Sequence, residues 1–212
     1  MLDTIGGWSY FGFGGFGTNG VMPPHAFWCY DSVDTGVLDA HAGNDSPGSA
    51  TPGLCSAVSY CSPANPNSTG FPVTLQILPN PGLGAGLHLD ASGGPEFRPG
   101  YFLVGSGIAN PPLVISDGVL CLSLASGNVL GRYNAFQTPR NSIGTFDASG
   151  NLVNLVGTSQ SGFGFDLPLE LPLPGGAVIQ AGETWYFQLW YRDVDSGGNS
   201  STNFSDAVSY TF

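Results

Sequence analysis

Two carboxylates and an amide lie close together in the segment Asp193-Val-Asp195-Ser-Gly-Gly-Asn199. Asp and Asn oxygens in a glycine-containing loop are ligands that Ca²⁺ takes in proteins, so Asp193, Asp195 and Asn199 form a calcium candidate. The segment lacks the bidentate Glu that closes an EF-hand. The competing and favoured interpretation is that Asp193 pairs with Arg192 or caps the turn. No other cofactor is expected.

No set of residues in the chain predicts catalysis. The three histidines are far apart in the sequence: His25, His41 and His88. No Gly-x-Ser-x-Gly segment marks an acyl-transfer nucleophile. Glycoside hydrolysis needs two carboxyl groups across a cleft, but each of the three glutamates has an ordinary explanation in a turn, among prolines or at a strand start: Glu96, Glu170 and Glu183. His88, between two leucines, is expected at a solvent-facing strand position. We therefore predict that the protein is not an enzyme.

The chain has four cysteines, which allow three disulfide pairings: Cys29, Cys55, Cys61 and Cys121. None forms a C-x-x-C pair and no histidine is near enough to suggest a zinc ligand set. Tryptophans could supply a sugar-stacking platform: Trp8, Trp28, Trp185 and Trp190. For Trp185 and Trp190, core packing is the favoured interpretation, although alternation leaves room for one of them to face outward.

The elements that would position these residues are short β-strands. Thirty-three Gly and 17 Pro with few charged residues indicate many strands joined by tight turns. Strand patterns recur at Val73 to Leu78, Gly86 to Asp90, Tyr101 to Val104, Val119 to Leu124, Val129 to Asn134, Leu152 to Val156, Gly162 to Leu167 and Ala177 to Gln180. Turns every 8 to 15 residues and no amphipathic helix predict an all-β fold, a single antiparallel β-sandwich or jelly roll with an extended N-terminal arm.

Two further strands are predicted at the C-terminus. Nearly every side chain from Thr184 to Tyr191 is large or aromatic, which favours a strand buried on both faces. The last segment alternates, and one side is expected to hold Phe204, Asp206, Val208, Tyr210 and Phe212. The other side would then hold Ser205, Ala207, Ser209 and Thr211.

Six separated motifs carry a resemblance to a known family. They are Tyr60-Cys61, Asn67-Ser-Thr-Gly70, Gly100-Tyr-Phe-Leu-Val-Gly105, Asp117-Gly-Val-Leu-Cys121, Ala181-Gly-Glu-Thr-Trp-Tyr-Phe-Gln-Leu-Trp-Tyr-Arg-Asp193 and Phe204-Ser-Asp206. In this order they resemble a C-terminal β domain common in secreted proteins of planctomycetes and similar environmental bacteria. The resemblance covers about residues 58 to 212. That family has no established activity, so it implies no catalytic residue.

The resemblance does imply a compartment and a disulfide pairing. It implies a secreted protein, at the cell surface or beyond it. In the family, the Tyr-Cys and later Leu-Cys positions look like partners, which implies Cys61 with Cys121 and leaves Cys29 with Cys55. Four buried thiols in a cytosolic protein are the alternative, and the absence of Lys counts against it.

The first 57 residues lie outside the resemblance and divide the chain into an arm and loop region, 1–57, and a β domain, 58–212. Between Ile5 and Gly20 the arm has five aromatic residues, seven glycines and no charge. It could pack on its own domain, or it could dock on a neighbouring subunit through an open sheet edge or a groove. The residues expected at such a subunit contact are Trp8, Tyr10, Phe11, Phe13 and Phe16.

Charge excludes one class of partner. Four Arg, no Lys and 15 acidic residues leave no basic cluster for nucleic acid. No segment of about 18 apolar residues predicts a membrane span, and residues 1–20 lack the pattern of a signal peptide. The leading hypothesis is a non-catalytic extracellular structural protein that self-assembles through its arm into a filament, sheath or surface layer. The alternative is a monomeric adhesion or carbohydrate-binding module, with a glycan as partner.

Overall fold

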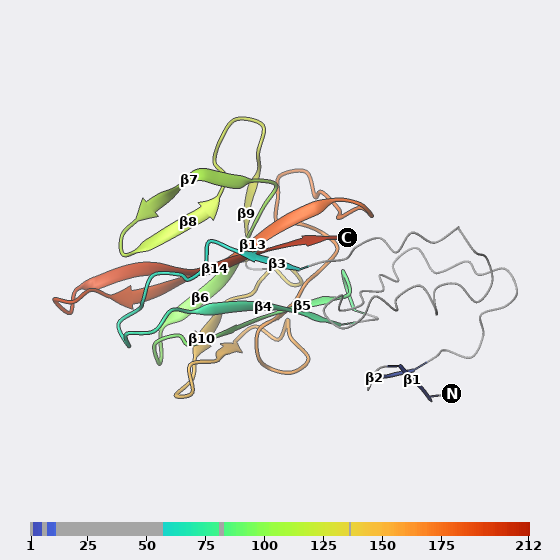
Figure 1. The fold of residues 1–212 in the computed structure, drawn as a ribbon, viewed down its shortest axis with the longest axis horizontal. Helices are drawn as coiled ribbons and strands as arrows, with labels where there is room; N and C mark the ends of the chain where they lie inside the picture. Colours follow the sequence, from blue (N-terminus) through green and yellow to red (C-terminus); the bar gives the residue numbers. More distant parts are fainter. Residues whose placement is uncertain (1, 6–7, 12–56, 81–82, 136) are drawn as a thin grey trace, which may run out of the picture.

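The structure is a computed structural model that describes residues 2–5, 8–11, 57–80, 83–135 and 137–212 (Figure 1). The strands are β1 (Leu2–Ile5), β2 (Trp8–Phe11), β3 (Val58–Tyr60), β4 (Thr74–Pro79), β5 (Leu87–Ser92), β6 (Pro99–Gly105), β7 (Ile108–Ile115), β8 (Gly118–Leu122), β9 (Leu130–Arg132), β10 (Gly144–Phe146), β11 (Leu152–Asn154), β12 (Phe165–Asp166), β13 (Thr184–Val194) and β14 (Ser200–Thr211). Every pairing between these strands is antiparallel, and the described residues contain no helix. The prediction of an all-β fold with antiparallel sheets is confirmed.

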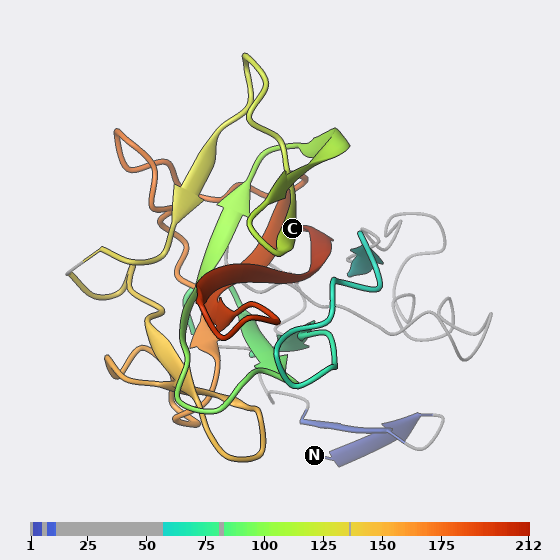
Figure 2. The same cartoon turned by 90° about the vertical axis from the view of Figure 1, so that its left-hand side faces the viewer.

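The described strands form four sheets. The largest, here the central sheet, has seven strands in the order β11-β10-β6-β13-β14-β3, and β9 also pairs with β6. The outer sheet has the order β12-β5-β4, and two-stranded sheets are formed by β7 with β8 and by β1 with β2. In Figure 1, the outer sheet and the β7–β8 hairpin lie on opposite sides of the long strands β13 and β14. The view in Figure 2, turned by 90°, shows β1 and β2 apart from the other strands.

The main core lies between the central and outer sheets. In β5, Leu87, Leu89 and Ala91 are buried while His88 and Asp90 alternate with them on the opposite face. The inward side chains belong to a cluster with residues of β6, β13 and β14, including Phe102, Phe187, Leu189, Tyr191, Val208 and Tyr210. The outer sheet therefore buries its apolar face and presents a polar face outward.

A smaller core lies on the other face of the central sheet, beneath the β7–β8 hairpin. It contains four buried residues: Leu103, Leu120, Leu122 and Phe204. Tyr186 and Trp190 of β13 pack against it, while Phe187 and Leu189 belong to the main core. The strand β13 is thus covered on both faces, as its aromatic run predicts.

The predicted alternation in the last strand is wrong at one point. A register shift lies between the pairs Gln188–Ala207 and Trp190–Phe204, so Ser205 and Asp206 of β14 both lie opposite Leu189. This β-bulge adds one residue and turns Phe204 to the face opposite Val208. Within the bulge, the hydroxyl of Ser205 accepts a hydrogen bond from the backbone N–H of Leu189 at 2.9 Å. The side chain therefore replaces a backbone partner that the bulge removes.

Two other strand predictions need correction. The expected strand from Ala177 to Gln180 is reduced to an isolated bridge between Val178 and Glu170. The strand β7, which the sequence did not predict, contains Pro111 and Pro112. Its register is irregular between Ile108 and Leu113, since prolines cannot donate to a ladder.

Candidate functional site

The predicted calcium segment forms a hydrogen-bonded turn between β13 and β14. One carboxylate oxygen of Asp195 accepts hydrogen bonds from the backbone N–H groups of Gly197 and Asn199, each at 2.8 Å. The Asn199 amide donates to the other oxygen at 3.0 Å. Hydrogen bonds from Asn199, above all from its side chain, lower the pKa of the exposed Asp195 carboxyl. Asp195 thus caps the turn.

The neighbouring Asp193 belongs to a different set of contacts. Its side chain is 2% exposed, and its two oxygens accept hydrogen bonds from the backbone N–H of Ser68, each at 3.2 Å. The Arg192 guanidinium lies 5.4 Å from the centre of the Trp190 ring. No group of three or more His, Cys, Asp or Glu side chains that could hold a metal occurs in the described part of the chain. Calcium binding by Asp193, Asp195 and Asn199 stays a prediction.

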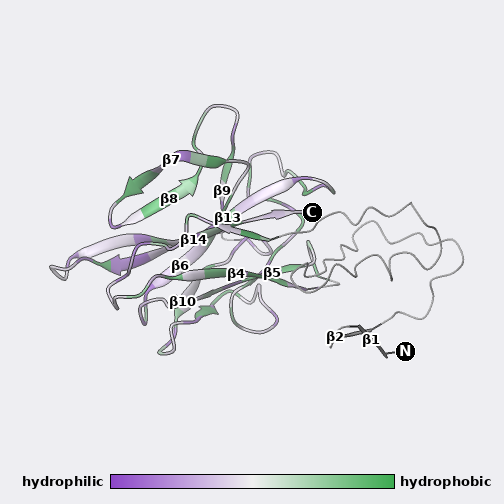
Figure 3. Cartoon of the chain, in the orientation of Figure 1, coloured by the Kyte–Doolittle hydropathy of each residue, from purple (hydrophilic) through white to green (hydrophobic). Residues whose placement is uncertain are grey.

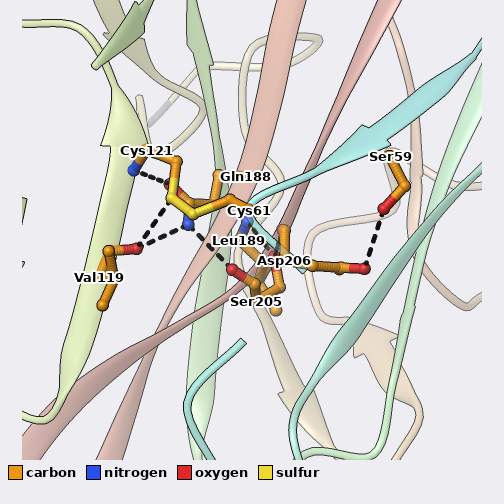
Figure 4. The surroundings of a disulfide bond; sticks show 8 residues. All are labelled: Ser59, Cys61, Val119, Cys121, Gln188, Leu189, Ser205 and Asp206. Carbon is orange, nitrogen blue, oxygen red and sulfur yellow. Dashed lines mark hydrogen bonds between the residues drawn. A yellow bond between two sulfur atoms is a disulfide. The ribbon is translucent and has the colours of Figure 1, made fainter. Parts of the chain in front are cut away.

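A disulfide joins Cys61, just after β3, to Cys121 in β8, across a sequence separation of 60 residues (Figure 4). This is the pairing that the family resemblance implies, and the structure contains it. The other predicted pair, Cys29 and Cys55, lies outside the described residues. The disulfide therefore attaches the β7–β8 hairpin to the edge of the central sheet, where β3 pairs with β14.

The side chain of Gln188 makes a second link to the hairpin. It is fully buried, and its amide oxygen accepts a hydrogen bond from the Cys121 N–H at 2.9 Å. Its amide nitrogen donates to the carbonyls of Val119 at 2.8 Å and Ser205 at 2.9 Å. Figure 4 shows this side chain beside the disulfide. An N–H and a C=O of β8 thus have the partners that a neighbouring strand would give them.

Asp206 links the central sheet to the outer sheet. Its carboxylate, 6% exposed, accepts a hydrogen bond from the Leu75 N–H at 2.7 Å, while its own N–H donates to the Val73 carbonyl at 3.2 Å. Burial raises the pKa of this carboxyl, and the hydrogen bonds from Leu75 and Ser59 partly oppose the rise. The bulge that contains Asp206 therefore fixes the position of β4.

His88 and Asp166 form a polar pair on the outward face of the outer sheet. The register places Asp166 of β12 on one side of His88 and Leu78 of β4 on the other. The Nδ1 atom of His88 lies 2.8 Å from an Asp166 carboxylate oxygen, and the two side chains are only 12% and 16% exposed. His88 thus lies on the outward face of β5, as expected, but its pairing with Asp166 leaves the side chain only partly exposed. Two further donors hold Asp166: the Asn80 amide at 2.8 Å and the Gln160 N–H at 2.7 Å.

This pair lines a cavity of about 590 Å³. The polar lining comes from Asn80, His88, Asp90, Asn151, Gln160, Ser161 and Asp166. The apolar lining comes from Leu78, Pro79 and Phe163. The Ser161 hydroxyl donates to the Phe163 carbonyl at 3.1 Å, and no described contact joins it to His88. Among the described contacts, the His–Asp pair of the cavity has no hydrogen bond to a serine hydroxyl.

A second exposed surface lies on β7. Leu113, Val114 and Ile115 are 39%, 78% and 40% exposed, and Ile108 at the start of the strand is 49% exposed. Figure 3 shows green, apolar colouring along much of the hairpin. Among the described strands, β7 pairs with β8 alone, so its outer edge has no strand partner. We call Ile108 and Leu113 to Ile115 the β7 patch.

The predicted contact residues of the arm are placed only in part. Trp8, Tyr10 and Phe11 belong to β2, and Phe13 and Phe16 lie outside the described residues, as does Trp28. The structure places Trp185 in the main core, 9% exposed, and packs Trp190 against Tyr101 with ring centres 4.8 Å apart. Neither tryptophan belongs to the cavity lining, which uses Phe163 as its aromatic residue.

Sequence reasoning missed the cavity because its residues come from separate segments. His88 and Asp166 are 78 positions apart, and neither stands in a recognisable motif. The sequence contains only one indication of the cavity, which is that His88 and Asp166 each alternate with apolar residues in a predicted strand. The β7 patch was missed because Pro111 and Pro112 of the same strand interrupt the strand pattern.

Comparisons with known proteins found no match to this chain. No protein-family model, curated protein or solved structure matches the chain. In the described residues, no helix is long and apolar enough to cross a membrane. The resemblance to the planctomycete domain and the boundary at residue 57 stay predictions.

Proposed function

We propose that the protein is a non-catalytic extracellular structural protein of the β-sandwich or jelly-roll type. Copies assemble when the N-terminal arm of one copy packs on the β7 patch of the next. The observation that carries this proposal is the β7 patch, a run of consecutive exposed apolar residues on a strand whose outer edge has no strand partner among the described residues. Exposed apolar surface of this kind is typical of protein interaction sites.

The arm has the chemistry to cover that patch. The segment from Ile5 to Gly20 is uncharged and contains five aromatic residues. The strands β1 and β2 at the start of the arm pair only with each other among the described strands. A two-stranded hairpin is marginally stable alone in water, so packing on another surface would stabilise it.

Charge favours the same contact. The chain has a net charge of −11, so copies repel one another over most of their surface. From Ile108 to Ile115 the sequence contains no charged residue. Contact between the uncharged segment from Ile5 to Gly20 and an uncharged strand therefore costs little in repulsion and desolvation.

The contact geometry leads to a polymer. Because the arm and the β7 patch are different surfaces, the contact is head-to-tail and forms a filament or sheet unless it closes into a ring. Pro111 and Pro112 limit the backbone hydrogen bonds that an added strand could make. We therefore expect the aromatic rings of Trp8 to Phe16 to pack mainly on Leu113, Val114 and Ile115.

Secretion is part of the proposal. The Cys61–Cys121 disulfide supports an oxidising compartment, and the family resemblance points to the same place.

Electron microscopy and analytical ultracentrifugation of the full chain test the proposal. Wild type should form filaments or sheets, while Val114→Asp and a variant lacking residues 1–20 should sediment as monomers with unchanged melting temperatures. Leu155→Asp is the matched control because Leu155 is 59% exposed but lies outside the β7 patch. A monomeric wild type, or normal polymers from Val114→Asp, would refute the proposal.

A further inference from the structure

We infer that the cavity on the outer sheet, here the His88 cavity, is a binding site for a neutral sugar. This inference is independent of assembly through the arm, since none of the cavity residues belongs to the β7 patch. The cavity volume of about 590 Å³ lies within the range of ordinary small-molecule sites, about 300 to 1,000 Å³.

Several polar groups around the cavity have unused hydrogen-bonding capacity. The Nε2 atom of His88 has no partner among the described residues, because only Nδ1 is used, by Asp166. The side-chain amides of Asn151 and Gln160 make no hydrogen bond to any described residue. Asp90 accepts a single hydrogen bond, from the N–H of Ala91 at 2.9 Å. Both hydrogen-bond donors and hydrogen-bond acceptors therefore line the His88 cavity, and a sugar hydroxyl can use both.

The His88 ring is held in place for this role. Asp166 fixes Nδ1 at 2.8 Å, and Asn80 and the Gln160 N–H in turn hold Asp166. Residue 164 is a glycine, and a Cβ there would lie 2.7 Å from His88 Nε2. Only a glycine therefore fits beside the ring at position 164, and the contact of Nδ1 with Asp166 orients the ring before any ligand arrives.

The apolar part of the lining suits the carbon face of a sugar ring. Phe163 and Leu78 are 41% and 42% exposed at the cavity, so their side chains keep apolar surface available to a ligand. A pyranose combines hydroxyl groups on its edge with C–H groups on its faces, and an aromatic ring packs well on such a face. Phe163 is therefore the expected stacking residue.

The same lining disfavours other ligand classes. It contains two carboxylates, Asp90 and Asp166, and no Lys or Arg, so phosphates and acidic sugars would be repelled. No metal-binding group of three or more side chains occurs among the described residues. A purely apolar ligand would leave His88 and Asp90 without partners. A neutral, hydroxyl-rich molecule satisfies the lining best.

Binding is measured on the full chain by calorimetry, after a screen of immobilised neutral oligosaccharides selects a probe. At least one neutral oligosaccharide should bind, and Asp90→Ala and Phe163→Ala should each weaken binding of that probe at least about tenfold. Trigalacturonate, the acidic probe, should bind at least about tenfold more weakly than the selected probe.

Gln76→Ala is the matched control. Gln76 is exposed on the same face of the outer sheet, directly opposite Asp90 in the register, but does not line the cavity. It should leave affinity unchanged, and all three variants should melt as wild type does. The inference fails if no neutral oligosaccharide binds, if trigalacturonate binds best, or if Asp90→Ala and Phe163→Ala bind as Gln76→Ala does.

Discussion

The outer sheet and the β7–β8 hairpin cover opposite faces of the central sheet, and they are held there by different means. The outer sheet is attached through the large main core and through the backbone and side chain of Asp206. The core beneath the hairpin has only four buried residues, two of which belong to β8. The Cys61–Cys121 disulfide, the Gln188 amide and hydrogen bonds between the β7–β8 turn and Thr202 supply further links.

This difference shows two ways to fix a layer. Burial of apolar area, at roughly 25 cal/mol per Å², attaches the outer sheet over its whole inner face, and Asp206 adds hydrogen bonds at one edge strand. The hairpin buries less, so covalent and hydrogen-bonded links at defined positions must keep it in place. Its outward side can then stay apolar and exposed, because the hairpin does not depend on that side for attachment.

Removing the disulfide should cause the largest loss of stability, and the loss should be greatest in the hairpin. Cys61→Ala/Cys121→Ala should lower the free energy of unfolding by about 4 kcal/mol, from the loop-closure entropy of a 60-residue separation. Chemical denaturation measures this loss. By hydrogen exchange, amides of β8 should lose more protection than amides of β5. Equal loss in both strands would show that the hairpin is not a separately attached layer.

Replacing Gln188 should have an intermediate effect. Gln188→Leu keeps a similar volume but leaves the Cys121 N–H and the Val119 and Ser205 carbonyls without their buried partner. We expect a loss of about 1–3 kcal/mol in the free energy of unfolding. The matched control is Gln76→Leu, an exposed site expected to change stability by less than about 0.5 kcal/mol. A Gln188→Leu variant as stable as the control would show that the Gln188 hydrogen bonds do not help to hold the hairpin.

The smallest expected change in stability is at Asp206, which contacts the outer sheet on the opposite face of the central sheet. Its pKa is raised above its ordinary value by burial, so its contribution to stability is full below the unfolded pKa and falls as pH rises through the folded pKa. Asp206→Asn keeps an acceptor for the Leu75 N–H but cannot ionise. From about pH 3 to 7, the variant should therefore gain stability relative to wild type in thermal unfolding curves. A constant difference across this range would contradict the raised pKa.

Composition and patterning were enough to predict the class of the fold. Glycine, proline and short alternating segments predicted antiparallel strands, and the aromatic run of β13 predicted its burial on both faces. The disulfide pairing came from the family resemblance, since four cysteines alone allow three pairings.

The remaining features depend on contacts that alternation cannot encode. The bulge at Ser205 and Asp206 is visible only when β14 is paired with β13, and it reverses the face of Phe204. The polar partner of His88 lies 78 residues away, so no local pattern joins the two. The exposed strand β7 was missed because Pro111 and Pro112 usually mark a loop.

The position of the disulfide has a consequence for when the β7 patch forms. In a reducing compartment Cys61 and Cys121 would stay unlinked, and only the small core and hydrogen bonds such as those of Gln188 would then hold the hairpin. Oxidation after export would lock the hairpin and complete the surface that a neighbouring arm recognises. If the proposed assembly is correct, each copy would therefore become competent to polymerise only after this disulfide has formed.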